Sequence, residues 1–143
     1  EMQRSLVGSE MCKETAYGLR IDPFSKKRSR HNGIDLRAKG EEAYAMLSGV
    51  VVKVGYDRRS GNFVTLRHGG YTVSYCHLSQ VLVRRGASVM PGEVIAITGN
   101  TGRSTGPHLH LTCKFQNRYI NPGILLQFVR ETKEEAVARL GIF

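Results

Sequence analysis

The chain has 143 residues, of which 41% are hydrophobic and 23% are charged. This length and composition fit one globular domain and exclude a multidomain enzyme, a collagen-like chain and a disordered chain. With 21 Lys and Arg residues against 12 Asp and Glu residues, the net charge is +9. Such a charge favours polyanionic partners, namely nucleic acid, an anionic membrane surface or an acidic cell-wall polymer, without choosing among them.

Cysteine content and hydropathy narrow the class further. Cys12, Cys76 and Cys113 are too few and too widely spaced for a disulfide scaffold, and they lack the C-x-x-C spacing of a structural zinc site. No run approaches the roughly 18–20 apolar residues of a membrane span, and the sequence begins without a signal-peptide pattern. Because signal peptides are removed from mature proteins, the compartment has to be argued from chemistry.

The predicted elements, in chain order, begin with an N-terminal arm over residues 1–15, which carry no periodic pattern. A short strand is expected over residues 17–24, where Pro23 ends it, and a basic loop follows over residues 25–30. From there, short β-branched runs alternate with turn-forming glycine and polar residues. The runs are residues 43–47, 50–56, 62–67, 71–78, 81–84, 94–98 and 108–115.

These runs predict a mainly β fold, with antiparallel sheets arranged as a sandwich or open barrel in one domain over residues 16–130. At the C-terminal end, Thr132 and Glu135 have the spacing of a capping box, and Ala136, Val137 and Leu140 share one helical face. We therefore expect a short helix within residues 131–143, packed on the domain or trailing it.

Five histidines are the candidate functional residues, because histidine is the commonest metal ligand and the usual acid or base near neutral pH. On a strand, His108 and His110 face the same side, with Cα atoms about 6.5–7 Å apart. His31 and Asp35 share a face of an extended chain, and together with a second histidine they leave a fourth tetrahedral zinc position open for water. Each pair, taken alone, is also typical of ordinary surface residues.

The remaining histidines lie in other runs. Alternation along residues 71–78 puts His77 on the same face as Val73 and Tyr75, so it is either a third functional imidazole or a half-buried structural one. His68 precedes a Gly-Gly turn, which favours a structural role in a hairpin. The glycine-rich residues 99–107 are followed by a strand and lack a Gly-Lys-Ser/Thr sequence, which excludes a nucleotide loop and favours the close approach of a substrate backbone.

Several short motifs occur in a fixed order along the chain. They are Tyr17-Gly18-Leu19-Arg20, His31-Asn32-Gly33-Ile34-Asp35, Ser48-Gly49-Val50-Val51, Tyr75-Cys76-His77-Leu78-Ser79, residues 99–110 with the His108-Leu109-His110 sequence, and Asn121-Pro122. Over residues 17–126 the chain thereby resembles the lysostaphin-type (LytM-like) zinc metallopeptidases, which cut peptide bonds in bacterial peptidoglycan. The resemblance implies a duplicated hybrid motif-like β fold and extracytoplasmic action.

The same resemblance implies the roles of the site residues. His31, Asp35 and His110 would hold one zinc ion per chain, and His77 and His108 would be the catalytic histidines. The substrate would be a glycine bridge or a stem-peptide cross-link, and nothing in the sequence selects one. The +9 charge would add electrostatic contact with an anionic wall polymer or membrane surface. A monomer is favoured, and no specific nucleic acid is expected because the aromatic residues form no stacking platform.

Cys76 and Cys113 depart from the family pattern, in which alanine and a polar residue are usual. The alternation of side chains along a strand predicts that Cys76 lies opposite His77 and Cys113 opposite His110, so both cysteines are expected behind the face that carries these histidines. A disulfide between the two cysteines is one alternative. A nucleophilic role for Cys76 is disfavoured because its neighbour His77 would point the other way.

Two other classes of function compete with the peptidase. LytM-like domains that have lost zinc ligands bind and activate other wall hydrolases, and the complete ligand set here argues against that role. A histidine phosphocarrier of similar β architecture would also pair two histidines, but it gives no reason for Asp35.

Overall fold

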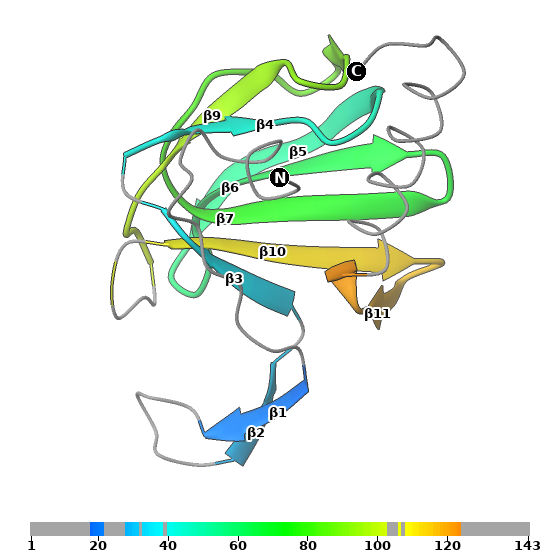
Figure 1. Ribbon diagram of the computed structural model, residues 1–143. Coiled ribbons are helices and arrows are strands. Elements are labelled where there is room, and N and C mark those ends of the chain that lie inside the picture. The colour runs from blue at the N-terminus through cyan, green and yellow to red at the C-terminus, as the bar shows by residue number, and fades with distance from the viewer. Residues whose placement is uncertain are drawn as a thin grey trace, which may run out of the picture.

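The computed structural model describes residues 18–21, 28–31, 33–38, 40–102, 106 and 108–123, and for residues 18–21 and 28–31 it describes the backbone alone. Strands dominate this part of the chain (Figure 1). They are β1 (Gly18–Ile21), β2 (Arg28–His31), β3 (Gly33–Arg37), β4 (Glu42–Tyr44), β5 (Gly49–Asp57), β6 (Gly61–His68), β7 (Tyr71–Val81), β8 (Ser88–Val89), β9 (Val94–Thr98), β10 (His108–Phe115) and β11 (Arg118–Ile120). The predicted N-terminal arm and C-terminal helix lie outside the described residues.

The strands form two antiparallel sheets. β1 and β2 make a two-stranded hairpin, and β3 to β11 make a nine-stranded sheet. The main path of the large sheet runs β11-β10-β7-β6-β5-β8, with β3 added to β10, and β4 added to β9, which itself pairs with β7. The sheet is not closed, since β11 and β8 at its two ends do not pair. The expectation of an open antiparallel β architecture is thus confirmed.

The run boundaries differ from the prediction in two places. The run over residues 81–84 is not a separate strand, because Gln80 and Val81 still pair with Ile97 and Ala96, so β7 extends to Val81. The run over residues 43–47 shortens to β4, which ends at Tyr44 after a register shift against β9. The strands β2, β3, β8 and β11 were not predicted, since runs of two to five residues carry little periodic signal. The predicted basic loop over residues 25–30 is wrong for residues 28–30, which pair with β1 as part of β2.

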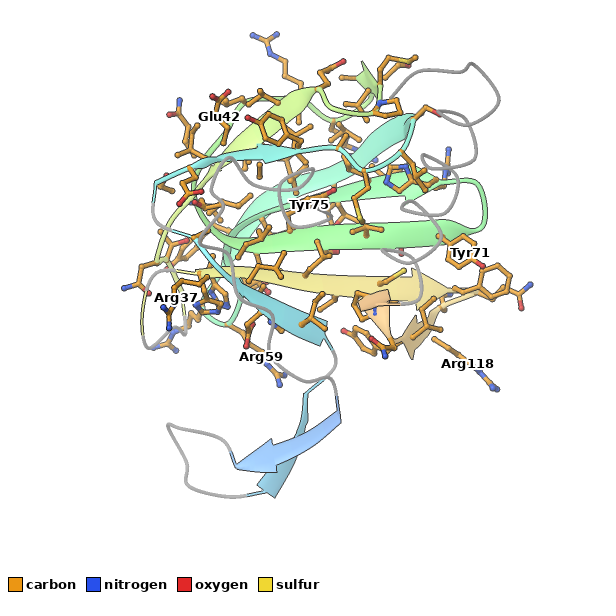
Figure 2. The ribbon with its side chains drawn as sticks, in the orientation of Figure 1. Arg37, Glu42, Arg59, Tyr71, Tyr75 and Arg118 are labelled. Atoms are coloured by element: carbon orange, nitrogen blue, oxygen red, sulfur yellow. The ribbon has the colours of Figure 1, made fainter. Side chains whose placement is uncertain are left out.

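The core lies where the apolar faces of these strands meet. On β10 the predicted alternation is confirmed, because Leu109, Leu111 and Cys113 are buried while His108 and His110 are half-buried. Tyr75 on β7 is fully buried in the middle of the molecule (Figure 2). Its hydroxyl donates a 3.2 Å hydrogen bond to the carbonyl of Tyr44 on β4. This bond ties β4 to β7 across the core.

No helix among the described residues has the length and apolar character that a membrane crossing requires.

The decisive feature for the site is a change of neighbour along one edge of β7. Residues Tyr71 to Cys76 pair with β10, whereas residues from Leu78 onward pair with β9. His77 stands between the two segments. β10 begins at the same point, where the amide of His108 donates to the carbonyl of Gly99 at 3.2 Å. The edge of β7 thus divides at His77, and the first residue of β10 lies beside this division.

His68, at the end of β6, has the predicted structural role. Its side chain is 6% exposed, and Nδ1 lies 2.9 Å from the carbonyl of Ser48, to which it donates. Its Nε2 is buried without a hydrogen-bond partner. Burial therefore lowers the pKa of His68 from its ordinary value of 6.5, although the bond to Ser48 opposes this.

This burial predicts a loss of stability in mild acid. Because folding lowers the pKa of His68, the unfolded chain binds a proton more readily, and the free energy of unfolding falls as the pH drops below about 6.5. His68→Asn keeps a donor near the Ser48 carbonyl and cannot be protonated. Urea unfolding of the metal-free protein at pH 7.5 and 5.0 should therefore show a smaller loss in the variant. Equal losses of stability in the two proteins would contradict the assignment. His77 is also buried, but it is present in both proteins, so its contribution is the same in each.

Candidate functional site

Two strands present the polar residues of the candidate site on one face. In the register of β3 with β10, Asp35 lies opposite His110 and Arg37 lies opposite His108. Paired residues of antiparallel strands share a face, so these four side chains project to the same side, opposite the buried Leu109 and Leu111. We call this side the histidine face.

Gly33 allows β3 to lie this close to β10. A Cβ atom at this position would collide with the backbone carbonyl of Leu111. The register that brings Asp35 to His110 therefore depends on a residue without a side chain two positions earlier. This gives Gly33 of the His31–Asp35 motif a physical role.

Asp35 joins the two histidines of β10. Its Oδ1 lies 2.6 Å from Nδ1 of His110 and 3.5 Å from Nε2 of His108. Nδ1 of His108 lies 2.7 Å from the carbonyl of Gly106, and since a carbonyl only accepts, that nitrogen carries the proton. A neutral His108 ring therefore presents the lone pair of Nε2 to a carboxylate oxygen. A proton or a cation between these atoms would stabilise the arrangement.

His77 reaches the histidine face through an unusual backbone conformation. Strict alternation would leave it on the core face with Val73 and Tyr75. Its φ of 62° is left-handed, which is uncommon for a residue with a side chain, and it breaks the alternation where β7 changes neighbour. The His77 ring centroid then lies 4.8 Å from that of His108 and 5.8 Å from that of His110. A conformation that costs about 1–3 kcal/mol is thus maintained at the site.

Two loops hold His77 in this position. Its amide donates to the carbonyl of Ser60 at 2.7 Å, and its Nδ1 lies 2.7 Å from the carbonyl of Thr101. The Thr101 hydroxyl donates to the carbonyl of Leu78 at 2.6 Å and accepts from the amide of Asn62 at 3.1 Å. Thr101 therefore fixes both the backbone beside His77 and the orientation of its ring.

The hydrogen bond to Thr101 also sets the tautomer of His77. Nδ1 donates to the carbonyl, so Nε2 carries the lone pair in the neutral ring. Burial lowers the pKa of His77 to about 4, with smaller contributions from His108 and His110. In the absence of metal, His77 is therefore neutral at pH 7, and Nε2 can accept a proton.

The prediction for Cys76 is wrong. Cys76 is the register partner of His110, so it lies on the histidine face and not behind it. The error follows from His77, since parity places neighbours on opposite faces only while the backbone stays extended. Cys113 is buried in the core as expected, and both thiols are free, so they form no disulfide. Burial raises the pKa of Cys76 to about 12, which makes it a poor nucleophile. Cys12 lies outside the described residues.

The structure brings together Asp35, His108 and His110 as a potential metal-binding group, whose ligand atoms lie within 4.8 Å of one another. Imidazole and carboxylate are donors that zinc accepts, and the half-buried position is compatible with one open coordination site. The backbone of His31 lies at the end of β2, paired with Gly18. The His31 side chain lies outside the described residues, so its part in the metal site stays a prediction.

Comparison with known proteins identifies the family. The profile of peptidase family M23 matches residues 29–122. ShyA of Vibrio cholerae, named a peptidoglycan DD-endopeptidase, is 40% identical over 104 residues, which cover 71% of this chain and 24% of ShyA. The chain therefore belongs to peptidase family M23. It spans about a quarter of the length of the curated relatives that it matches.

Solved structures agree with this family. A zinc-containing peptidase from Vibrio cholerae has a TM-score of 0.72 at 33% identity, covering 82% of this chain and 37% of the other. The catalytic domain of lysostaphin from Staphylococcus simulans has a TM-score of 0.72 at 29% identity, covering 81% of this chain and 92% of that domain.

Sequence reasoning missed the residues that position His77. The carbonyls of Thr101 and Ser60 could be supplied by any residue, so residue type carries no signal for these two contacts. The hydroxyl of Thr101 contacts Asn62 and Leu78, which are distant in sequence, so a local pattern does not reveal its role. Gly61 gives a partial signal, since its φ is 67° and an added Cβ would collide with Thr101. Arg37 was also missed, because its position beside His108 follows from the register of β3 with β10.

Removing the Thr101 hydroxyl should disturb this arrangement. In Thr101→Val the amide of Asn62 loses its acceptor, which should lower the free energy of unfolding by about 1–3 kcal/mol. The side-chain NMR resonances of His77 should shift as its loop relaxes. Thr65→Val is the matched control, because it removes a side-chain hydrogen bond to Ser74 of 2.8 Å in the sheet. Unchanged His77 resonances in Thr101→Val would show that the hydroxyl does not position the ring.

Proposed function

We propose that the chain is a zinc-dependent endopeptidase that hydrolyses peptide bonds in bacterial peptidoglycan. The observation that carries the proposal is the convergence of Asp35, His77, His108 and His110, from three strands, on one half-buried site. Membership of family M23 supports the peptidase class, and relatives named as peptidoglycan endopeptidases support the substrate.

In this proposal His31, Asp35 and His110 hold one zinc ion per chain. The 2.6 Å approach of Asp35 to His110 supports a shared role, because it brings the two donor atoms close enough for one ion to contact both. When bound, zinc supplies Lewis acidity, which polarises a carbonyl and makes water a nucleophile near neutral pH.

His77 and His108 are the proposed proton-transfer residues. In each ring Nδ1 is fixed by a backbone carbonyl, that of Thr101 for His77 and that of Gly106 for His108. Each Nε2 is therefore the nitrogen left to act as the reactive atom. His77 is suited to accept the proton of the attacking water. His108 is suited to hydrogen-bond the developing oxyanion or the leaving amine once it carries a proton.

We further propose that the enzyme acts outside the cytoplasm, where peptidoglycan lies. The +9 charge supports attraction to an anionic wall polymer. Because Coulomb attraction is screened by salt, binding to isolated sacculi is expected to weaken as ionic strength rises. The competing function is a regulatory module that binds another wall hydrolase, and the digestion experiment below separates the two.

Digestion of purified peptidoglycan tests the proposed reaction. The zinc-loaded chain should generate new peptide termini, detected by mass spectrometry, that disappear after chelation and return when zinc is added. His110→Ala should lose both the zinc and the activity, since it removes one ligand. His68→Asn is the control, because His68 lies away from the site. A chain that retains zinc but cuts no peptidoglycan preparation would contradict the proposal and favour the regulatory module.

Substitution of His77 separates proton transfer from metal binding. His77→Ala should lower kcat/KM by about 10²–10⁴-fold, which is the usual contribution of a general acid or base. Its zinc content, measured by mass spectrometry of the native protein, should stay at one ion per chain. Full activity with zinc bound would exclude His77 from the reaction, whereas loss of zinc would reassign it as a ligand.

A further inference from the structure

An arginine lies on the histidine face beside the proposed catalytic residues. Arg37 is the register partner of His108, and it is the next residue after Asp35 on the same face of β3. Its side chain is exposed, whereas Asp35 and His108 are half-buried. Arg37 therefore stands at the solvent side of the histidine cluster, on the β3 side.

Two further arginines lie on the other side of the cluster, in the turn between β5 and β6. Asp57 Oδ1 accepts hydrogen bonds from the amides of Arg59 at 2.9 Å and Ser60 at 2.6 Å, so the turn is fixed internally. The Ser60 carbonyl in turn accepts from the amide of His77 at 2.7 Å. The turn that carries the exposed Arg58 and Arg59 is thus bound to the backbone of His77 through Ser60.

No ion pair of these arginines occurs in the part of the chain that the structure describes. Within the described residues, the ion pairs near the site join Asp35 to His108 and His110, and none involves Arg37, Arg58 or Arg59. The Asp57 carboxylate is used by backbone amides of its own turn. Figure 2 shows Arg37 and Arg59 at the same end of the molecule, the end at which β10 begins, with Arg118 at the opposite end.

We propose that Arg37 and Arg59 select a peptide that carries a free carboxylate close to the scissile bond. Guanidinium groups bind carboxylates through paired, charge-assisted hydrogen bonds, which are among the stronger polar contacts in proteins. A substrate that crosses the histidine cluster from β3 to the β5–β6 turn passes between the two side chains. The inference rests on the proposed function. It adds a substrate preference, for acidic cross-linked stem peptides over neutral oligoglycine.

Matched peptides test this selection. Cross-linked peptide dimers released from peptidoglycan are compared with the same dimers after their carboxylates have been converted to carboxamides. Affinity is measured with chelator present, so that no turnover occurs, and kcat/KM is measured with zinc. The native chain should prefer the carboxylate form by about 10-fold or more in affinity, as charge-assisted hydrogen bonds commonly supply. Oligoglycine should behave like the carboxamide form.

Arginine variants assign the preference to these residues. Arg37→Gln and Arg59→Gln should each reduce it severalfold, and the double variant should abolish it while binding the carboxamide form as before. Arg118→Gln, an exposed arginine at the far end of the sheet, should keep the full preference. Arg37→Lys should retain part of it, because the charge remains while the paired hydrogen bonds are lost.

The two measurements separate the inference from the proposed function. Selective, arginine-dependent binding without any cleavage would support the carboxylate site and contradict the peptidase. Cleavage with equal affinity for both peptide forms would support the peptidase and overturn the carboxylate site. A preference that survives in the double variant would also overturn the assignment.

Discussion

The candidate site depends on one backbone constraint, the left-handed conformation of His77. β7 leaves β10 and joins β9 at this residue, and the change of neighbour occurs where the chain turns a side chain from the core to the histidine face. Had β7 continued in extended form, His77 would have lain in the core with Tyr75, and the cluster would have lost one of its three imidazole rings. The division of the sheet edge therefore determines which residues meet in the candidate site.

This strained residue is held by loops that contact each other. Gly61 at the start of β6 and Gly102 after β9 both have positive φ, and an added Cβ at either position would collide with the segment that contains the other. The close approach places the Thr101 carbonyl at the His77 ring and the Ser60 carbonyl at the His77 amide. Each loop thus supplies one backbone acceptor, which together offset the cost of the His77 conformation. Thr101 and Gly102, in the glycine-rich residues 99–107, accordingly have a role in orienting His77.

Residue periodicity is a good guide to this protein as long as the backbone stays regular. Alternation on β10 is sufficient to place His108 and His110 on one face and Leu109 and Leu111 in the core, because every described residue of that strand is extended. The same rule fails at His77, where a positive φ turns the ring to the face that Cys76 also occupies, so Cys76 was placed on the wrong face by reference to His77. The positions of Asp35 and Arg37 beside His110 and His108 depend on the register of β3 with β10. Register is a long-range property that a pattern within either strand does not contain. Short strands such as β8 fail for a simpler reason, since two residues cannot show a period.

The electrostatics of the site follow from the same arrangement. Asp35 contacts His108 and His110, and its proposed partner is a metal ion. Asp57 is closer to Arg58 and Arg59 in sequence, but it accepts backbone hydrogen bonds that shape their turn. The pKa of Asp57 is lowered chiefly by its hydrogen bond from Ser60, which keeps this carboxylate ionised in its structural role. Within the described residues, Asp57 is thus committed to shaping its own turn, while Arg37, Arg58 and Arg59 are exposed around the site. If the chain acts as proposed, exposed arginines at these positions would attract anionic substrate groups to both sides of the histidines, where an extended peptide would lie with its scissile bond at His77 and His108.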